Sequence, residues 1–271
     1  MSATVARAIT ASARLLTWPL KPWRRRAAQA LAAELLELDL DVQTSRGLLR
    51  FHCPTRESLH FVREFSLREP ETLAWIDSFR PGDVFWDIGA NVGQYSLYAA
   101  LASGVRTLAF EPGAASYSAL IRNIEVNRMD DRIAAYCLGF GDATGLSTLN
   151  MARTDAGSSM HAIGVDTDSL GRTIKVRFRQ AVSVYSIDGF LTTFDAPFPT
   201  HIKLDVDSIE EKIIAGARRS LADRRLQSMM VEIEGGLDTP RARTIIEALR
   251  LAGLAHRPDA ARSTNVLFRR L

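Results

Sequence analysis

Four residues, each two positions apart, are candidates for ligand chemistry: Asp87, Gly89, Asn91 and Gly93, in the segment DVFWDIGANVGQYSLYAA. A hydrophobic run ends at Asp87, and a helical pattern begins just after the loop. Glycines allow a backbone to turn tightly and to approach a ligand. The start of the following helix offers partial positive charge at the same place. The segment therefore predicts a ligand-binding turn between a strand and a helix.

The spacing D-x-G-x-N-x-G differs from the G-x-G-x-x-G of dinucleotide sites, whose glycines make room for a pyrophosphate. Here the middle glycine is absent, and the Asp87 carboxylate precedes the loop. A carboxylate repels a pyrophosphate but suits a ligand with a positive centre or with hydroxyl donors. S-adenosylmethionine has both, because it carries a sulfonium, an ammonium and a ribose diol. We therefore expect this cofactor at the loop.

Two further carboxylates follow the next two β-rich runs. Glu111 ends the run LAFE, about 20 residues beyond the loop, where an acidic residue binds ribose hydroxyls in dinucleotide folds. Asp142 follows the third run, in GFGDATG, where a carboxylate can accept a hydrogen bond from an adenine amino group. Three successive strand ends with an acidic residue are stronger evidence than one glycine loop alone.

The elements that position these residues alternate from Asp83 onward between β-rich runs and helical runs. This alternation predicts a parallel sheet with helices on both faces, and such sheets bind ligands beyond the carboxyl ends of their strands. The rhythm breaks after about residue 142 with a strand, a Gly/Ser/Asp-rich loop and a second strand. It then resumes, and Ser208 with Glu211 has the spacing of a capping box at a helix start.

Four segments together resemble the FkbM family of S-adenosylmethionine-dependent methyltransferases: GDVFWDIGANVGQYSLYAA, AFEPGAASYSALIRNIEVN, LGFGDATGLSTL and IKLDVDSIEEKIIAGA. The resemblance covers roughly residues 65–235. It implies an α/β, Rossmann-like class I methyltransferase fold, with a mostly parallel seven-stranded sheet, one antiparallel strand in its last strand pair, and helices on both faces. It also implies O-methylation, often of a sugar or polyketide hydroxyl.

The resemblance also implies roles for individual residues. The loop positions Asp87, Gly89, Asn91 and Gly93 would face the methionine part of the cofactor. Glu111 would bind the ribose, and Asp142 the adenine. The segment REPET, before the first strand of the alternating region, is similar to the family as well, and it suggests that Glu71 and Thr72 close over the cofactor.

One departure from the family pattern lies after the fourth strand. The family reads D-V-E-G-x-E, whereas this chain has Asp205, Val206, Asp207, Ser208, Ile209 and Glu210. Asp207 keeps the charge with a shorter side chain. Ser208 replaces a glycine, which puts a backbone role with positive φ in doubt at that position. The geometry on the substrate side is therefore expected to differ from the family norm.

The candidates for catalysis lie on the fourth and fifth strands. We expect Asp205 to act as the base or to orient the acceptor, with Lys203 two residues earlier on the same strand face. If the two side chains pair, the ammonium keeps Asp205 ionised. The alternative is a purely structural ion pair. Glu232 and Glu234 are further carboxylates; no histidine joins them at ligand spacing, so no metal is expected. His161, in the Gly/Ser loop, is a second candidate base, or else an exposed histidine without a role.

The charge of the chain is unevenly distributed. The net charge is +3, but no acidic residue precedes Glu34, and the residues beyond the basic N-terminal arm carry a net charge of −3. The arm's cations are Arg7, Arg14, Lys21, Arg24, Arg25 and Arg26. They stand beside Trp18 and Trp23, which favours contact with an anionic membrane surface, the alternatives being a helix packed on the body or partial disorder. We expect residues 1–44 to be a helical, basic extension and residues 45–271 to be the methyltransferase domain.

The composition also bounds the function. Two isolated cysteines make neither a disulfide framework nor a zinc site, so Cys53 and Cys137 are expected as thiols in a reducing compartment. We expect a cytoplasmic protein, in peripheral contact with a membrane if the arm binds lipid. A net acidic body argues against a nucleic-acid partner and leaves a small-molecule or glycan acceptor. The competing hypotheses are a nicotinamide-dependent oxidoreductase and a non-catalytic methyltransferase-fold binding protein.

Overall fold

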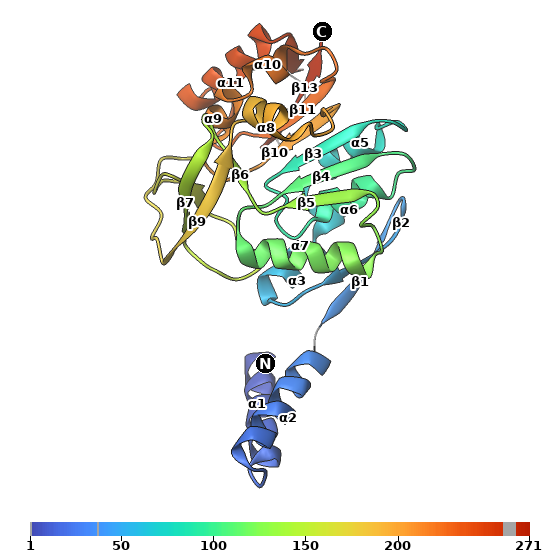
Figure 1. Cartoon of the computed structure of the whole chain (residues 1–271), viewed down its shortest axis with the longest axis vertical. Coiled ribbons are helices and arrows are strands. Elements are labelled where there is room, and N and C mark those ends of the chain that lie inside the picture. The colour runs from blue at the N-terminus through green and yellow to red at the C-terminus, as the bar shows by residue number, and fades with distance from the viewer. Residues whose placement is uncertain (1, 37, 257–263) are drawn as a thin grey trace. The chain divides into compact units, whose positions relative to one another are not determined.

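The computed structural model describes residues 2–36, 38–256 and 264–271 of the chain (Figure 1). The chain divides into two compact units, residues 1–39 and residues 40–271. The first unit is a pair of helices, α1 (Ser2–Thr17) and α2 (Pro22–Leu35). The second contains the remaining elements, and the candidate site lies within it. The functional division expected after residue 44 stays a prediction.

The central element of the second unit is a seven-stranded sheet in the order β12-β13-β11-β10-β3-β4-β5. Its strands are β3 (Val84–Ile88), β4 (Arg106–Phe110), β5 (Ile133–Tyr136), β10 (His201–Leu204), β11 (Ser228–Glu232), β12 (Leu254–His256) and β13 (Asn265–Arg270). Neighbouring strands from β5 to β11 are parallel, and β13 pairs antiparallel with both β11 and β12. The mostly parallel sheet with an antiparallel strand in its last pair is therefore confirmed.

Two buried apolar clusters cover the two faces of this sheet. Successive side chains of a strand point to opposite faces, and in β3 Trp86 belongs to one cluster while Phe85 belongs to the other. The Trp86 cluster packs against α8 (Ile187–Phe194), α9 (Glu210–Ala215), α10 (Arg218–Ala222) and α11 (Pro240–Leu251). The Phe85 cluster packs against α5 (Pro70–Asp77), α6 (Gln94–Ala100) and α7 (Ala114–Val126). The expected helices on both faces are confirmed.

The strand register places three polar side chains on the α5/α6 face of the sheet. Lys203 of β10 is level with Asp87 of β3 and Met230 of β11, and Met230 belongs to the Phe85 cluster. Glu232, two residues beyond Met230, points to the same face. The carboxyl ends of the central strands thus gather ionisable groups on one side, whereas the other face is apolar.

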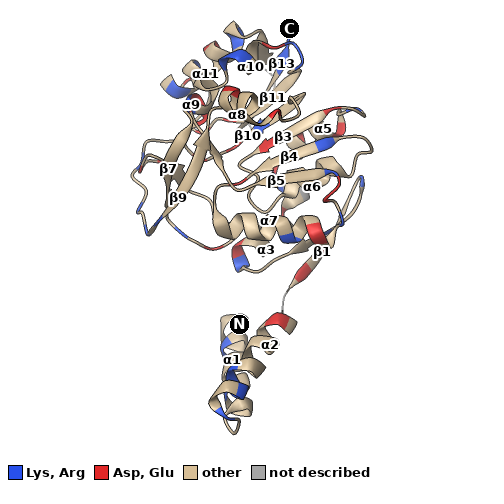
Figure 2. Cartoon of the chain, viewed as in Figure 1, with Lys and Arg blue, Asp and Glu red and all other residues tan. Residues whose placement is uncertain are grey.

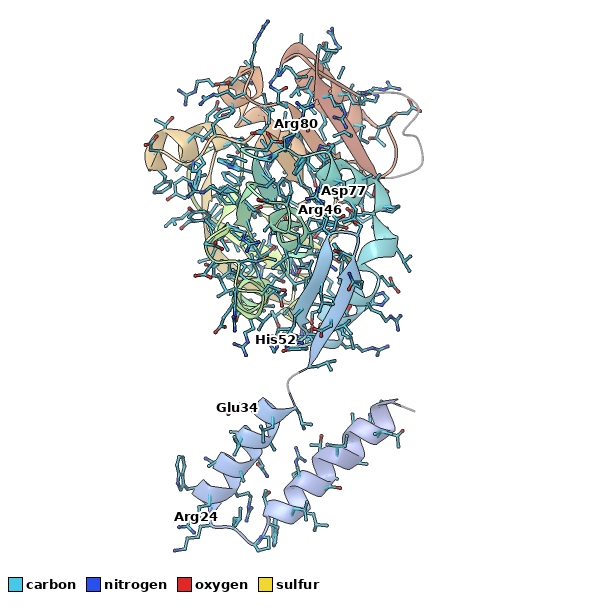
Figure 3. All side chains as sticks on the ribbon, turned by 90° about the vertical axis from the view of Figure 1, so that its right-hand side faces the viewer. Arg24, Glu34, Arg46, His52, Asp77 and Arg80 are labelled. Atoms are coloured by element: carbon cyan, nitrogen blue, oxygen red, sulfur yellow. The ribbon has the colours of Figure 1, made fainter. Side chains whose placement is uncertain are left out.

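A hairpin and two short helices lie on the α5/α6 side of the sheet. Strands β1 (Asp39–Thr44) and β2 (Gly47–His52) form the hairpin, and α3 (Arg56–Arg63) and α4 (Phe65–Arg68) follow it. Asn123 of α7, which is fully buried, accepts a hydrogen bond from His52 N at 2.6 Å and donates one to Val92 O at 2.8 Å. Arg46 in the hairpin turn pairs with Asp77 at the end of α5, Nε to Oδ1 at 2.6 Å (Figure 3). The hairpin is therefore joined to the segment that carries the ligand loop.

A second sheet interrupts the alternating pattern; the break after about residue 142 predicted strands in this part of the chain but not a separate sheet. It has the order β6-β9-β7-β8, with β6 (Gly139–Phe140), β7 (Gly145–Met151), β8 (His161–Ile163) and β9 (Phe178–Tyr185). The third β-rich run of the sequence splits here, because β5 ends at Tyr136 in the large sheet and β6 enters the small one. The loop that carries His161 is thereby fixed along the edge of β7.

Two local predictions need correction or comment. The capping box at Ser208 is wrong: α9 begins at Glu210, its N-cap residue is Ile209, and no side chain caps it. Ser208 instead lies in the turn that precedes the helix, with its hydroxyl buried.

Cys53 is buried and Cys137 is exposed. Across the described residues, no helix combines the length and the apolar character needed to cross a membrane.

Candidate active site

A cavity of about 230 Å³ opens at the carboxyl ends of β3, β4, β10 and β11. Its wall includes Glu232, the last residue of β11, and the residues that directly follow the other three strands: Gly89, Glu111 and Asp205. α4 and α6 line a second side, and the loop leading into β8 lines a third. The cavity therefore lies where open α/β sheets bind their ligands.

The loop after β3 can form only because residue 89 is a glycine. Gly89 has φ +88°, and a Cβ placed there would lie 1.7 Å from the carbonyl oxygen of Asp205. The amides of Gly89 and Ala90 both donate to Phe110 O at 3.0 Å, which fixes the loop against β4. The neighbouring strand ends thus approach each other more closely than a side chain would permit.

Glu111 joins the loop to the end of β4. Its Oε2 accepts a hydrogen bond from the Asn91 amide at 2.9 Å, and its Oε1 accepts one from the Gly113 amide at 2.7 Å. The side chain lines the cavity, although the residue is only 7% exposed. Burial raises the pKa of Glu111 to about 7, even though both amide donors favour the ionised form. Each oxygen keeps a lone pair for a further donor.

Asp87 and Gly93 support the loop and are not part of the cavity wall. Asp87 is 1% exposed and accepts a hydrogen bond from Ser96 Oγ at 2.6 Å, and burial raises its pKa to about 6. Gly93 has φ +87°, and a Cβ there would lie 2.3 Å from Leu120 Cδ1. These two residues therefore hold the loop against α6 and α7, while Gly89 and Asn91 line the cavity.

Three polar atoms in the cavity wall have no hydrogen-bond partner in the described structure. They are Asn91 Oδ1, Ser158 Oγ and His161 Nδ1, and all three are buried. An unpaired buried polar group costs about 1–3 kcal/mol, so native structures normally satisfy such groups with protein, water or ligand. Three of them around one cavity indicate a polar ligand at this position.

The structure places three other predicted residues outside the cavity wall. Asp142 is exposed, and its Cα lies against Gly216 at the end of α9. Glu71 and Thr72 are in α5, and neither lines the cavity. Thr72 is connected to the cavity only through Glu69, because its Oγ1 donates a hydrogen bond to Glu69 Oε2 at 2.9 Å. The contacts predicted for these three residues with a cofactor therefore find no support in the geometry.

Arg68 and Glu69, which the sequence interpretation overlooked, line the cavity instead. Both belong to REPET, the segment in which Glu71 and Thr72 were chosen. Pro70 begins α5, so the residues after it enter the helix while the two before it remain at the cavity. The position of proline at a helix start could have indicated this division.

Lys203 lies at the centre of the ionisable cluster. Lys203 is 1% exposed. Its Nζ donates a hydrogen bond to Asp205 Oδ2 at 2.5 Å and lies 3.8 Å from Glu69 Oε2. The ammonium also sits 4.7 Å from the ring centroid of Tyr95. Burial alone would lower the pKa of Lys203, but the carboxylates of Asp205 and Glu69 outweigh it and raise that pKa. The pairing of Lys203 with Asp205 is therefore present, and Lys203 is charged.

Asp205 and Glu232 form a second pair in the same cluster. Burial disfavours the ionised form of Asp205, but the Lys203 ammonium and a hydrogen bond from Glu232 outweigh it and lower the pKa of Asp205. The Asp205 carboxylate, together with burial, raises the pKa of Glu232 to about 10. At neutral pH, Asp205 is thus ionised and Glu232 holds the proton between them.

Asp207 fixes the loop that carries His161. Its Oδ2 accepts hydrogen bonds from the amides of Met160 at 2.8 Å and His161 at 3.4 Å, and burial raises its pKa to about 6. Asp207 itself has φ +69°, so the left-handed position of this turn is one residue before Ser208. The backbone role that the missing glycine put in doubt is therefore taken by Asp207.

His161 lies in the wall of the cavity and is therefore not an exposed loop histidine, while its role as a base stays a prediction. It begins β8 and is half-buried, and burial lowers its pKa, so the imidazole is neutral at neutral pH. Glu234 lies nearby in the wall and accepts a hydrogen bond from Ser169 Oγ. Within the described residues, no group of three or more His, Cys, Asp or Glu side chains is arranged to hold a metal ion.

A sequence profile described as "Methyltransferase FkbM domain" matches residues 87–253, which is more than half of the chain. The chain belongs to the FkbM methyltransferase family. The matched segment of this FkbM methyltransferase contains the loop after β3, Glu111 and the Lys203–Asp205 pair. The resemblance seen in the sequence is confirmed, and the protein is a methyltransferase.

Two curated relatives support the same assignment for the FkbM methyltransferase. It is 20% identical over 223 residues to the hexuronic acid methyltransferase AglP of Haloferax volcanii, covering 82% of this chain and 86% of that one. It is 24% identical over 156 residues to the 31-O-demethyl-FK506 methyltransferase FkbM of Streptomyces tacrolimicus, covering 51% of this chain and 60% of that one. Both relatives are named as methyltransferases.

Two solved structures are also similar to this FkbM methyltransferase. An S-adenosylmethionine-dependent O-methyltransferase of Thermotoga maritima matches with a TM-score of 0.44 and 10% identity, covering 86% of this chain and 77% of that one. The TYW2 protein of P. horikoshii, solved with MeSAdo, matches with a TM-score of 0.44 and 12% identity, covering 92% of this chain and 84% of that one.

Proposed function

We propose that this FkbM methyltransferase uses S-adenosylmethionine to methylate a hydroxyl group of a glycan or another hydroxylated natural product. The observation that carries the proposal is that Glu111, three residues with unpaired buried polar atoms and the Lys203–Asp205 pair all line one cavity. A hydroxylated cofactor and a hydroxylated acceptor would satisfy these groups together.

The cavity residues fit the cofactor in three parts. Glu111 has free acceptor positions for the two ribose hydroxyls, as the residue pattern predicted. The carboxylate of Glu69 suits a positively charged sulfonium and ammonium. An apolar part of the wall suits the adenine ring; it consists of Leu138, Phe140, Leu149, Ile163 and Ile209. Asp142 has no part in this fit.

The transfer itself requires alignment and removal of one proton. S-adenosylmethionine, when bound, supplies a methyl carbon bonded to a sulfonium leaving group. Asp205 is ionised and can accept a hydrogen bond from the acceptor hydroxyl, which orients its oxygen toward that carbon. As the O–C bond forms and the C–S bond breaks, the hydroxyl proton must pass to a base.

His161 suits the role of base better than Asp205. Lys203 lowers the pKa of Asp205, which makes that carboxylate a weak base. His161 Nδ1 is unpaired in the cavity wall, and burial keeps the imidazole neutral and able to take a proton. We therefore assign orientation of the acceptor to Asp205 and proton removal to His161.

The acceptor class follows from Arg68 and from one relative. Arg68 is an exposed cation in the cavity wall, and its guanidinium lies over the Phe61 ring at 4.3 Å. The relative from Haloferax volcanii is named for hexuronic acid, a sugar with a carboxylate. The carboxylate of an acidic sugar would pair with the exposed guanidinium of Arg68. The carboxylates of the cavity wall would repel the sugar's carboxylate and so favour its position at Arg68. A hexuronic acid within a glycan is thus the acceptor class that we propose to test first.

Calorimetry with S-adenosylmethionine, S-adenosylhomocysteine and NADH separates this proposal from a nicotinamide-dependent oxidoreductase. We expect binding of the first two compounds and no binding of NADH. Transfer of a labelled methyl group to uronic acid-containing glycans, with neutral glycans as the comparison, then tests the acceptor. Binding of NADH alone would exclude the proposal, and cofactor binding without transfer to any hydroxylated acceptor would favour a binding protein.

Asp205→Asn tests the acceptor side separately. The substitution keeps the size of the side chain but removes the charge that pairs with Lys203. We expect turnover to fall by roughly 10²-fold or more while affinity for S-adenosylmethionine changes little, because Asp205 is assigned to the acceptor. Glu247→Gln, which breaks an exposed ion pair with Arg250, is the matched control. Full activity in Asp205→Asn would contradict the assignment.

A further inference from the structure

The two N-terminal helices expose an unusual amount of apolar surface. Among the residues that the structure describes, twenty-one large hydrophobic side chains are exposed, and eleven of them lie within the first 38 residues. In α2 no residue is buried at all. A helix pair of this size cannot bury enough apolar surface to be stable by itself, since domains below about 40 residues usually need additional support. We therefore expect a partner surface to cover these exposed apolar side chains.

The apolar and basic side chains of α1 lie on opposite faces. Val5, Ile9 and Leu16 fall on one stripe of the helix at 3.6 residues per turn, and all three are exposed. Arg7 and Arg14 fall on the other side. A helix with an apolar stripe and a basic opposite face is typical of segments that lie in the plane of a membrane interface.

Trp18 lies in the turn after α1, and Trp23 is the second residue of α2. Arg25 Nη2 donates to Trp18 O at 2.7 Å, its guanidinium lies 4.8 Å from the Trp18 ring centroid, and Gln29 Nε2 donates to Thr17 Oγ1 at 2.9 Å. These contacts join α2 to the end of α1. Trp18 is nevertheless 70% exposed and Trp23 77% exposed. Tryptophan is enriched at the membrane–water interface, where an apolar ring and a polar N–H both find partners.

The charge of the helix pair selects a negatively charged surface. Six cations lie between Arg7 and Arg26, and Glu34 is the first acidic residue of the chain. In Figure 2 the positively charged residues are spread over α1 and the start of α2, and the negative charge stands at the end of α2. Figure 3 shows the same separation along α2, with Arg24 near its start and Glu34 near its end. Each cation near an anionic lipid surface contributes to binding.

We infer that residues 2–36 dock on an anionic lipid surface. The apolar stripe of α1 and the rings of Trp18 and Trp23 enter the interface, and the arginines and Lys21 pair with lipid phosphates. An apolar protein surface would satisfy the stripe, but it would leave the six cations unmatched. The inference rests on the helix pair alone and does not depend on the proposed methyl transfer.

Sedimentation of the full chain with vesicles tests the inference. We expect binding to vesicles of phosphatidylcholine containing one third phosphatidylglycerol, weak binding to phosphatidylcholine alone, and loss of binding as salt increases. Replacing Arg24 and Arg26 with glutamine should weaken binding about thirtyfold, because each cation near the surface is worth about a factor of five. Replacing Trp18 and Trp23 with alanine should weaken it further.

Matched variants of the body control for general effects. Arg218→Gln with Arg243→Gln removes two exposed cations outside the helix pair, and Phe178→Ala with Phe194→Ala removes two exposed aromatic rings there. Both controls should bind vesicles as the unchanged chain does. Equal binding to both vesicle types, or equal losses in the controls, would overturn the inference. So would failure to bind vesicles together with self-association that the tryptophan substitutions abolish, since the partner would then be a second copy of the chain.

Discussion

At the scale of single residues, the buried environment of Glu111 predicts a measurable pH dependence of cofactor binding. Its pKa of about 7 in the free protein means that it is mostly protonated near pH 6 and mostly ionised near pH 8. The ionised form accepts ribose hydroxyls best, so binding should favour it. We expect affinity for S-adenosylmethionine to rise about tenfold from pH 6 to pH 8, with release of a proton at the lower pH. Calorimetry in buffers of different ionisation enthalpy measures both quantities.

Substitution of Glu111 provides the control for that pH effect. Glu111→Gln should weaken binding roughly tenfold to a hundredfold and remove the pH dependence, because hydrogen bonds to a charged group are worth about 1.5–3 kcal/mol. Glu125→Gln, on the exposed side of α7, should change neither. A pH dependence that persists in Glu111→Gln would assign the titration to another group and place the ribose elsewhere.

His161 should control the pH dependence of turnover itself. Its imidazole must be neutral to accept a proton, and burial lowers its pKa below the ordinary value of 6.5. At saturating cofactor and acceptor, we therefore expect kcat to fall on the acid side, below about pH 6.5. His161→Gln should reduce kcat roughly 10²–10⁴-fold while cofactor affinity stays nearly unchanged. An unaltered acid limb in His161→Gln would return the role of base to Asp205.

At the scale of elements, the contact between the ends of β3 and β10 depends on one glycine. Gly89→Ala would place a Cβ 1.7 Å from Asp205 O, whereas Gly82→Ala, at a similar positive φ, meets no atom within 4 Å. We expect Gly82→Ala to cost about 1–3 kcal/mol of stability through backbone strain alone. Gly89→Ala should cost clearly more or prevent folding, as chemical denaturation of both variants would show. Equal losses would mean that the strand ends separate easily.

The elements around the cavity explain which predictions succeeded. The alternation of β-rich and helical runs was sufficient for a parallel sheet with helices on both faces, because each β-rich run and the helix after it form a local pattern. The number of seven strands came from the family resemblance, since β3 and β10 are neighbours in the sheet but lie far apart in sequence. The positions of Gly89, Asn91, Glu111, Lys203 and Asp205 followed from the parallel sheet, since the carboxyl ends of parallel strands meet at one edge. Here local pattern and tertiary position agree.

Other predictions failed where distant elements decide the outcome. Asp142 follows the third strand in sequence, but the chain leaves the large sheet at Tyr136 and enters the small one. Its carboxylate therefore lies beyond the cavity, and no local pattern marks that exchange of sheets. Likewise, Ser208 and Glu211 have the spacing of a capping box, yet a turn with positive φ at Asp207 delays the start of α9. The spacing of residues in the sequence does not predict these tertiary contacts.

At the scale of the whole molecule, the helix pair and the body are expected to function separately. The three buried apolar clusters draw on residues from Leu40 to Phe268, and the cavity wall begins at Phe61. Removing residues 1–38 should therefore change the melting temperature by less than about 2 °C and leave affinity for S-adenosylmethionine unaltered. Binding to anionic vesicles should disappear in the same truncated protein. A truncation that unfolds would show that the helix pair belongs to the core, whereas one that still binds vesicles would place the lipid-binding surface on the body.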